Sequence, residues 1–179
     1  MRITLFTSNK NRHNYLINLL SEVSEELFVV QECGTILPVP DHYQASPIMK
    51  KYFESVIDAQ SYLFGNSYVN NKKKNIKILP MVFGDLNQCS MNLLSDFLRS
   101  DIYVVFGSSY IKGELADFLV KQKAINIHAG VSPYYRGAAC NFWALYDDNS
   151  HLVGTTIHLL SKGLDSGPML YHAMSNLKN

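Results

Sequence analysis

Three polar residues in the C-terminal half have types and spacing suited to attack on a carbonyl group. Asn126 and His128 flank Ile127 in the segment INIHAGVSPYYRG, and Asp165 follows later in the turn GLDSG. If residues 124–128 end a strand, Asn126 and His128 project from the same face, because side chains alternate along a strand. An imidazole, a carboxylate and an amide together could move a proton and donate a hydrogen bond to a developing oxyanion.

Each of these residues also has an ordinary structural interpretation. Asp165 before Ser-Gly-Pro is a common turn residue, His128 could be a hydrogen-bonded core histidine, and Asn126 could hold a loop in place. Their position favours a functional role. Both segments fall where expected strands end, and open α/β sheets bind ligands in the crevice beyond the carboxyl ends of their strands.

The elements that must position these residues follow from apolar runs and helical spacing. Strands are expected at 2–7, 27–33, 76–79, 102–106, 124–128, 153–160 and 169–172, and helices at 14–20, 47–64, 91–98, 111–120 and 139–146. For the long helix, Ser46 is the expected cap, Pro47 the first residue and Gly65 the end. Its expected inward stripe comprises Met49, Tyr52, Phe53, Val56, Ile57, Ala59 and Leu63, and residues 34–47 before it are expected to be irregular. Alternating strands and helices predict an α/β fold, a mostly parallel sheet with helices on both faces, in one domain over residues 1–179.

Composition narrows the class of protein. The chain has 179 residues, of which 47% are hydrophobic and 17% charged, as in one ordinary globular domain. No apolar run is long enough for a membrane span, and the start MRITLFTSNKNRH lacks the apolar region of a secretory signal, so a cytoplasmic location is expected. With 16 basic and 15 acidic residues the net charge is +1, which argues against nucleic acid as a partner.

Cysteine and histidine spacing gives no reason to expect a metal. Cys33, Cys89 and Cys140 are odd in number and show no zinc-site spacing, so buried free thiols are expected. His172 could be imagined beside His128 and Asp165 as a ligand set, but three such residues alone are weak evidence for zinc. The basic run 72–74, flanked by asparagines, is expected to be a solvated loop.

The motifs together resemble those of the folate-dependent formyltransferases. This family includes glycinamide ribonucleotide formyltransferase, the catalytic domain of methionyl-tRNA formyltransferase and the nucleotide-sugar N-formyltransferases. Its Asn-x-His, Pro-x-x-Arg-Gly loop, Thr-Ile-His strand and Gly-x-Asp-x-Gly turn correspond here to NIH, SPYYRG, TTIH and GLDSG. The resemblance covers Asp101 to His172, whereas the first hundred residues match only in general βα layout.

The resemblance implies a Rossmann-like formyltransferase fold and a reaction. A primary amine would attack the formyl carbon of N10-formyltetrahydrofolate, Asn126 and His128 would stabilise the resulting oxyanion, and Asp165 would hold His128 and help to remove the amine's proton. The family binds the pterin in a crevice that corresponds to the loops 107–112 and 160–163, mainly through backbone groups. The implied cofactor-binding residues are Tyr110, Lys112, Ser161, Lys162 and Gly163.

Departures from the family's sequence pattern limit which amine acceptor is expected. Glycinamide ribonucleotide enzymes carry a glycine-rich phosphate loop after the first strand, where this chain reads TSNKNRHN. The tRNA enzymes add a C-terminal domain and basic surface, which this sequence lacks. A nucleotide-linked amino sugar is therefore the expected acceptor, with Lys10, Arg12 and His13 as possible phosphate contacts or simply the start of a surface helix. The family's last elements are expected to be absent after Asp165, so the alternative is a truncated, non-catalytic folate- or nucleotide-binding homologue. An ordinary dinucleotide binder is disfavoured, since no GxGxxG follows the first strand.

Overall fold

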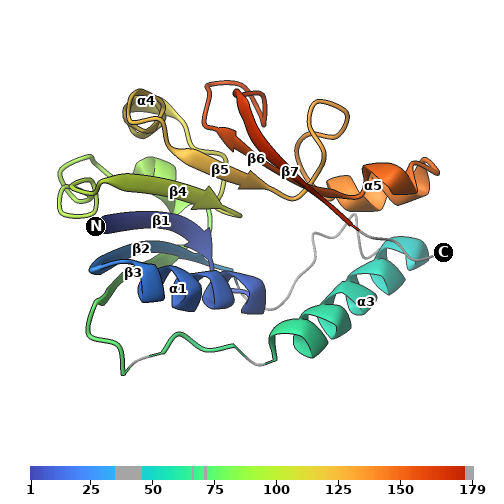
Figure 1. Ribbon diagram of the computed structural model, residues 1–179, viewed down its shortest axis with the longest axis horizontal. Coiled ribbons are helices and arrows are strands. Elements are labelled where there is room, and N and C mark those ends of the chain that lie inside the picture. Colours follow the sequence, from blue (N-terminus) through green and yellow to red (C-terminus); the bar gives the residue numbers. More distant parts are fainter. Residues whose placement is uncertain (35–45, 66, 71, 176–179) are drawn as a thin grey trace.

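One seven-stranded sheet forms the centre of the molecule (Figure 1). The computed structural model describes residues 1–34, 46–65, 67–70 and 72–175. The strand order is β3-β2-β1-β4-β5-β6-β7; the first five strands are parallel, whereas β6 runs antiparallel to β5, and β7 to β6. The strands are β1 Arg2–Ser8, β2 Glu26–Cys33, β3 Ile76–Val82, β4 Ile102–Phe106, β5 Ile125–His128, β6 Gly154–Leu159 and β7 Met169–Met174. The expected mostly parallel sheet is confirmed.

Helices connect the strands on both faces. They are α1 Asn11–Val23, α3 Pro47–Phe64, α4 Gly113–Lys121 and α5 Cys140–Tyr146, with short 3₁₀ turns η1 Asp85–Gln88 and η2 Ser150–Leu152. The helix expected at 91–98 is wrong, because this segment is a succession of turns. Its backbone bonds mix two spacings: the N–H of Leu94 donates four residues back to Ser90, but that of Phe97 donates only three back to Leu94. The carbonyl of Phe97 accepts instead from the Thr4 hydroxyl on β1.

The long helix α3 has the expected ends but not the expected packing. The Ser46 side chain accepts from the Met49 N–H at 3.4 Å, Pro47 is the first residue, and Gly65 ends the helix at φ +60°. Of the predicted inward stripe only Met49 is buried, and Leu63 is 67% exposed. The reason is visible in Figure 1, where α3 extends away from the sheet instead of lying across it. An apolar stripe does not by itself say which surface will cover it.

α3 is joined to its neighbours by a few aromatic contacts. Tyr52 packs against Phe142 of α5, with ring centroids 4.8 Å apart, and Phe64 packs against Tyr15 of α1 at 5.2 Å. Tyr15 itself is half exposed, whereas Ile17 of α1 is fully buried. The helical segment 14–20 is therefore confirmed, but its sheet-facing side is centred on Ile17.

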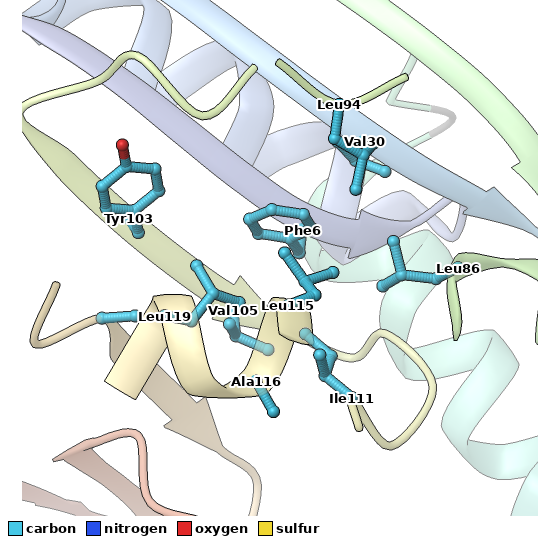
Figure 2. Close-up of a cluster of buried hydrophobic side chains, with 11 residues drawn as sticks. Phe6, Val30, Leu86, Leu94, Tyr103, Val105, Ile111, Leu115, Ala116 and Leu119 are labelled. Carbon is cyan, nitrogen blue, oxygen red and sulfur yellow. The ribbon is translucent and has the colours of Figure 1, made fainter. Parts of the chain in front are cut away.

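Two hydrophobic clusters, one on each side of the sheet, form the core. Neighbouring residues of β1 point to opposite sides: Phe6 belongs to one cluster and Leu5 to the other. Figure 2 shows the larger cluster, in which α4 packs on the sheet. Its buried members are Phe6, Val30, Leu86, Leu94, Tyr103, Val105, Ile111, Leu115, Ala116, Leu119 and Ala124. The second contains Ile3, Leu5, Ile17, Leu27, Val29 and Val104. Burial on both faces is typical of parallel strands and confirms that helices cover both sides.

Smaller expectations have mixed outcomes. All three cysteines are free, but only Cys140 is buried, so the prediction of buried thiols is wrong for Cys33 and Cys89. Both are half-buried, because Cys33 is the last residue of β2 and Cys89 directly follows the turn η1, where coverage by other elements is incomplete. In the basic run 72–74, the Lys73 Nζ atom lies 3.4 Å from Glu22 Oε1.

The irregular connection expected at 34–47 falls almost entirely outside the described residues. None of the helices in the described ranges is both long and apolar enough to cross a membrane.

The core predicts a contrast between two leucines. Leu119 of α4 is fully buried, whereas Leu145 of α5 is 48% exposed. We expect Leu119→Ala to lower the free energy of unfolding by about 2–5 kcal/mol, because it leaves a cavity against the sheet. The matched Leu145→Ala should change it by less than about 1 kcal/mol. Urea unfolding followed by circular dichroism measures both, and equal losses would contradict the packing of α4.

Candidate active site

Strand β5 brings Asn126 and His128 to one face of the sheet. Their side chains are buried, with Ile127 between them more exposed, as the alternation along a strand requires. β6 lies antiparallel beside β5, and its register places His158 opposite Asn126 and Thr156 opposite His128. The expectation that the two β5 side chains share a face is confirmed.

The Asp165 carboxylate joins these two residues. It stands in the turn between β6 and β7, at φ +42°, a backbone conformation that aspartate tolerates better than most residues. Its Oδ1 accepts from Asn126 Nδ2 at 3.0 Å, and its Oδ2 lies 3.3 Å from His128 Nδ1. The same Oδ2 accepts from the backbone N–H of Gly137 at 2.9 Å. The structure therefore brings together all three residues that the sequence singled out.

A second histidine, His158, completes the cluster. Its Nδ1 lies 2.8 Å from the Leu159 carbonyl, and a carbonyl only accepts, so Nδ1 carries a proton. In the neutral ring Nε2 is then an acceptor, and it receives Asn126 Nδ2 at 3.0 Å. Nε2 also lies 3.7 Å from Asp165 Oδ1. The motif TTIH was noted in the sequence, but no role was assigned to His158. The signal that could have found it is the pairing of β6 with β5.

Charges within the cluster stabilise one another. The interaction with Asp165 raises the pKa of His158 above its usual value, although burial opposes the shift. Burial alone would raise the pKa of Asp165, but His158, the Gly137 N–H and His128 together lower it. The carboxylate is therefore the form that this site favours. Burial, together with the nearby Asp165 charge, raises the pKa of the Cys140 thiol to about 11, so this thiol stays protonated at neutral pH.

The loop of the SPYYRG motif closes over His128. The ring Nε2 lies 3.1 Å from the Tyr135 carbonyl and therefore donates to it. Gly130 permits this approach, because a Cβ there would stand 2.6 Å from His128 Nε2 and 2.5 Å from Cys140 Cβ. The loop is tied down at its tip, where the Tyr135 hydroxyl contacts Asp147 Oδ2 at 3.1 Å. Both nitrogens of His128 thus face acceptors.

The two loops expected to bind the cofactor lie side by side. The Tyr110 hydroxyl, in loop 107–112, donates to the Lys162 carbonyl in loop 160–163 at 2.7 Å. Lys112 Nζ lies 5.7 Å from the centre of the Tyr110 ring, and Ser161 Oγ donates to the Gly163 carbonyl at 3.2 Å. All five residues named for cofactor binding therefore belong to one region. That they bind folate stays a prediction.

Of the residues expected as phosphate contacts at the start of α1, His13 is not suited to that role. His13 is almost fully buried, and burial, with the charges of Arg12 and Lys10, lowers its pKa to about 3. It is therefore neutral and cannot act as a cation toward a phosphate. Its Nδ1 instead accepts from the Lys10 backbone N–H at 3.3 Å, as part of the helix start. That Lys10 and Arg12 contact a phosphate stays a prediction.

A metal centre has no support in the described part of the chain. No group of three or more His, Cys, Asp or Glu side chains there could hold a metal ion. His128 and Asp165 approach each other, but their neighbours Asn126 and Gly137 donate hydrogen bonds to the carboxylate instead of supplying metal ligands. That activity needs no metal stays a prediction.

Comparison with known proteins gives a local match in sequence. Residues 98–178 match the family model described as formyl transferase. Methionyl-tRNA formyltransferase from Thermosynechococcus vestitus is 40% identical over 73 residues, which cover 41% of this chain and 22% of that protein. The enzyme from Clostridium acetobutylicum is 35% identical over 80 residues, covering 45% of this chain and 25% of that protein. The matches thus span about a quarter of these relatives.

Comparison with solved structures extends the likeness to nearly the whole chain. Phosphoribosylglycinamide formyltransferase from Anaplasma phagocytophilum has a TM-score of 0.59 and 20% identity, covering 97% of this chain and 71% of that one. The formyltransferase PseJ from Anoxybacillus kamchatkensis, solved with UDP-4,6-dideoxy-4-formamido-L-AltNAc and tetrahydrofolate, has a TM-score of 0.52 and 18% identity, covering 99% of this chain and 62% of that one. Such identities establish the fold alone. Residues 98–178 thus match the formyl transferase family in sequence, and nearly the whole chain shares the Rossmann-like fold of solved formyltransferases.

Proposed function

We propose that this chain transfers a formyl group from N10-formyltetrahydrofolate to a primary amine. The observation that carries the proposal is the contact of Asp165 with both Asn126 and His128 at the end of β5. The loops 107–112 and 160–163, which follow β4 and β6 and contact each other through Tyr110 and Lys162, are the segments that we infer to bind the folate donor. A cavity of about 610 Å³ is lined by the turn 84–91 and by residues 112–115, but by none of Asn126, His128 and Asp165, so it does not locate the donor. The match of residues 98–178 to the formyl transferase family model supports the same donor.

The residues have separate tasks in this reaction. Attack of the amine on the formyl carbon places negative charge on the formyl oxygen, which Asn126 and His128 are positioned to meet with N–H donors. Both donors are engaged within the protein: His128 Nε2 with the Tyr135 carbonyl, and Asn126 Nδ2 with His158 and Asp165. Productive binding therefore requires the formyl oxygen to replace one of these acceptors.

Asp165 handles the proton that the reaction moves. The amine loses one proton as its new bond to carbon forms, and N10 gains one proton as its bond to carbon breaks. A group that accepts the first proton and can return one to N10 therefore balances the reaction. The Asp165 carboxylate is ionised and held beside His128, which makes it a suitable acceptor, directly or through water. It also fixes the orientation of the imidazole.

We propose a nucleotide-linked amino sugar as the acceptor. The segment TSNKNRHN, which runs from the end of β1 into α1, has no glycine with which to form a glycine-rich phosphate loop, and this disfavours glycinamide ribonucleotide. The net charge of +1 disfavours tRNA. The fold neighbour PseJ was solved with a UDP-linked formamido sugar. Methionyl-tRNA is the second candidate, because the curated relatives with similar sequences are methionyl-tRNA formyltransferases. A folate- or nucleotide-binding homologue without turnover is the remaining alternative.

One experiment separates these possibilities. The chain is incubated with N10-formyltetrahydrofolate and, in turn, with dTDP- and UDP-linked amino sugars, glycinamide ribonucleotide and methionyl-tRNA, and the products are examined by mass spectrometry. The proposal predicts a mass gain of one formyl group on an amino sugar. Formylation of methionyl-tRNA alone would replace the acceptor, and donor binding without any product would support the non-catalytic alternative.

The role of Asp165 predicts a separation of rate from binding. Asp165→Asn keeps the size of the side chain but cannot accept a proton or hold His128 through a charge, so kcat should fall by about 100-fold or more. The dissociation constant of tetrahydrofolate should change little, because the two binding loops are untouched. Asp96→Asn, which alters an exposed carboxylate that pairs with Arg99 outside the site, is the control and should keep its rate. If Asp165→Asn retains most of its rate, Asp165 is only a turn residue.

The protonation of His158 predicts a pH effect that NMR can measure. The His158 pKa, which the Asp165 carboxylate raises in the native chain, should fall in Asp165→Asn, where that carboxylate no longer opposes the effect of burial. Because the folded-state pKa is raised, the His158–Asp165 interaction stabilises the fold fully below the unfolded pKa, and this stability is lost as the pH rises through the folded pKa. The ring resonances of His158 report the midpoint. An identical midpoint in both proteins would contradict the interaction.

Removing metal ions should leave turnover unchanged. The groups that approach Asp165 are hydrogen-bond donors, and the described residues include no metal-ligand cluster. The measurement is formyl transfer before and after dialysis against a chelator. Loss of activity that one divalent ion restores would overturn this expectation.

A further inference from the structure

The carboxamide of Asn87 bridges two points of loop 107–112. Its Nδ2 donates to the Tyr110 carbonyl at 2.9 Å, and its Oδ1 accepts from the Lys112 backbone N–H at 2.8 Å. One side chain therefore holds a carbonyl and an N–H two residues apart, as a neighbouring strand would. Asn87 belongs to the turn η1 and is far from this loop in sequence. It fixes the backbone of the loop without contacting the active-site cluster.

Glu32 holds the same loop from beneath. It is the penultimate residue of β2 and is fully buried. Its Oε2 accepts from the Ser109 backbone N–H at 2.6 Å, and its Oε1 accepts from the Ser109 hydroxyl at 2.8 Å. Oε1 also accepts from the Gly84 N–H at 2.9 Å, at the start of the turn that carries Asn87. A buried carboxylate is unfavourable unless its oxygens are satisfied, so the loop and the turn are both drawn to Glu32.

We propose that Asn87 and Glu32 are positioning residues for the folate site, an inference that rests on the proposed function. Together they tie loop 107–112 to the turn 84–88 at consecutive points, while Tyr110 ties it to loop 160–163 on the other side. The loop is thereby held in one shape before the ligand arrives, which lowers the entropy lost on binding. Three of its backbone groups, the N–H of Ser109, the carbonyl of Tyr110 and the N–H of Lys112, are already used by these side chains. Folate must therefore be recognised by other groups of the loop.

The chain offers a matched control for Asn87. Asn18 of α1 makes the same kind of bridge, with its Nδ2 donating to the Tyr68 carbonyl and its Oδ1 accepting from the Asn70 N–H, both at 2.9 Å. The two carbonyl and N–H groups are again two residues apart, and both bridges lie at the surface. Asn18, however, holds a segment outside the proposed folate site. A purely structural role for such a bridge should therefore affect both sites alike.

The experiment compares Asn87→Asp with Asn18→Asp. Each change turns the donor that meets a carbonyl into an oxygen that repels it, without changing the size of the side chain. Asn87→Asp should raise the dissociation constant of tetrahydrofolate about tenfold and speed hydrogen exchange of the amides in 107–112. Asn18→Asp should leave both unchanged and speed exchange only in 67–70. Glu32→Gln, which removes the charge and one acceptor, should act on loop 107–112 in the same way as Asn87→Asp.

The two readouts keep this inference apart from the proposed function. If exchange in 107–112 is unchanged in Asn87→Asp and Glu32→Gln, these residues do not position the loop and the inference is overturned. It is also overturned if exchange rises but the folate affinity of Asn87→Asp equals that of Asn18→Asp. If the unaltered chain fails to bind tetrahydrofolate, the proposed function fails, and with it the link to folate, while exchange still decides whether the loop is held.

Discussion

The arrangement at the end of β5 depends on satisfying one largely buried carboxylate. Asp165 is 12% exposed, and its oxygens are met by Asn126 from β5 and by the Gly137 N–H from the SPYYRG loop, with His128 close by. A carboxylate in such a place is unfavourable without donors, so the turn, the strand and the loop stabilise one another only in this arrangement. The Asp165 backbone carbonyl adds a fourth link, to the Ser132 hydroxyl at 3.2 Å.

This interdependence explains how much of the site the sequence could predict. Strand alternation was enough to place Asn126 and His128 on one face, and the glycines around Asp165 indicated a turn. The participation of His158 could not be read from spacing, because it follows from the antiparallel register of β6 against β5. His13 shows the opposite error, since a helix start that looked exposed in the sequence is covered by Gly107 and Phe106 of β4 and its loop.

The sequence was enough to predict the strands that are buried on both faces. It was not enough to predict how α3 and the segment 91–98 pack, because that depends on parts of the chain that are distant in sequence. The apolar runs of β1, β2 and β4 identify strands that helices cover on both faces. The stripe of α3 identifies a helix, but Leu63 and Ile57 remain exposed because α3 does not lie across the sheet. At 91–98 the apolar spacing suggested a helix, whereas contacts from β1 and β4 are made with carbonyls of a chain of turns.

Binding and chemistry are placed on different parts of this framework. The residues proposed for catalysis lie on β5, on β6 and in the turn before β7. All of them fall within the segment 98–178 that matches the formyl transferase family in sequence. The supports of the proposed folate loop, Glu32 and Asn87, lie before that segment. The N-terminal half, which resembles the family only in fold, thus contributes the shape of a loop in the other half. Changes in the two parts should affect different steps.

We propose that Asp165 and His128 act as one unit in formyl transfer. The most direct test is a double-mutant cycle in kcat. It compares the unaltered protein, His128→Asn, Asp165→Asn and the double variant with the same amine acceptor. If the two residues act together, the combined loss should be much smaller than the product of the single losses. Losses that multiply would show that the two side chains act independently and would contradict the claim.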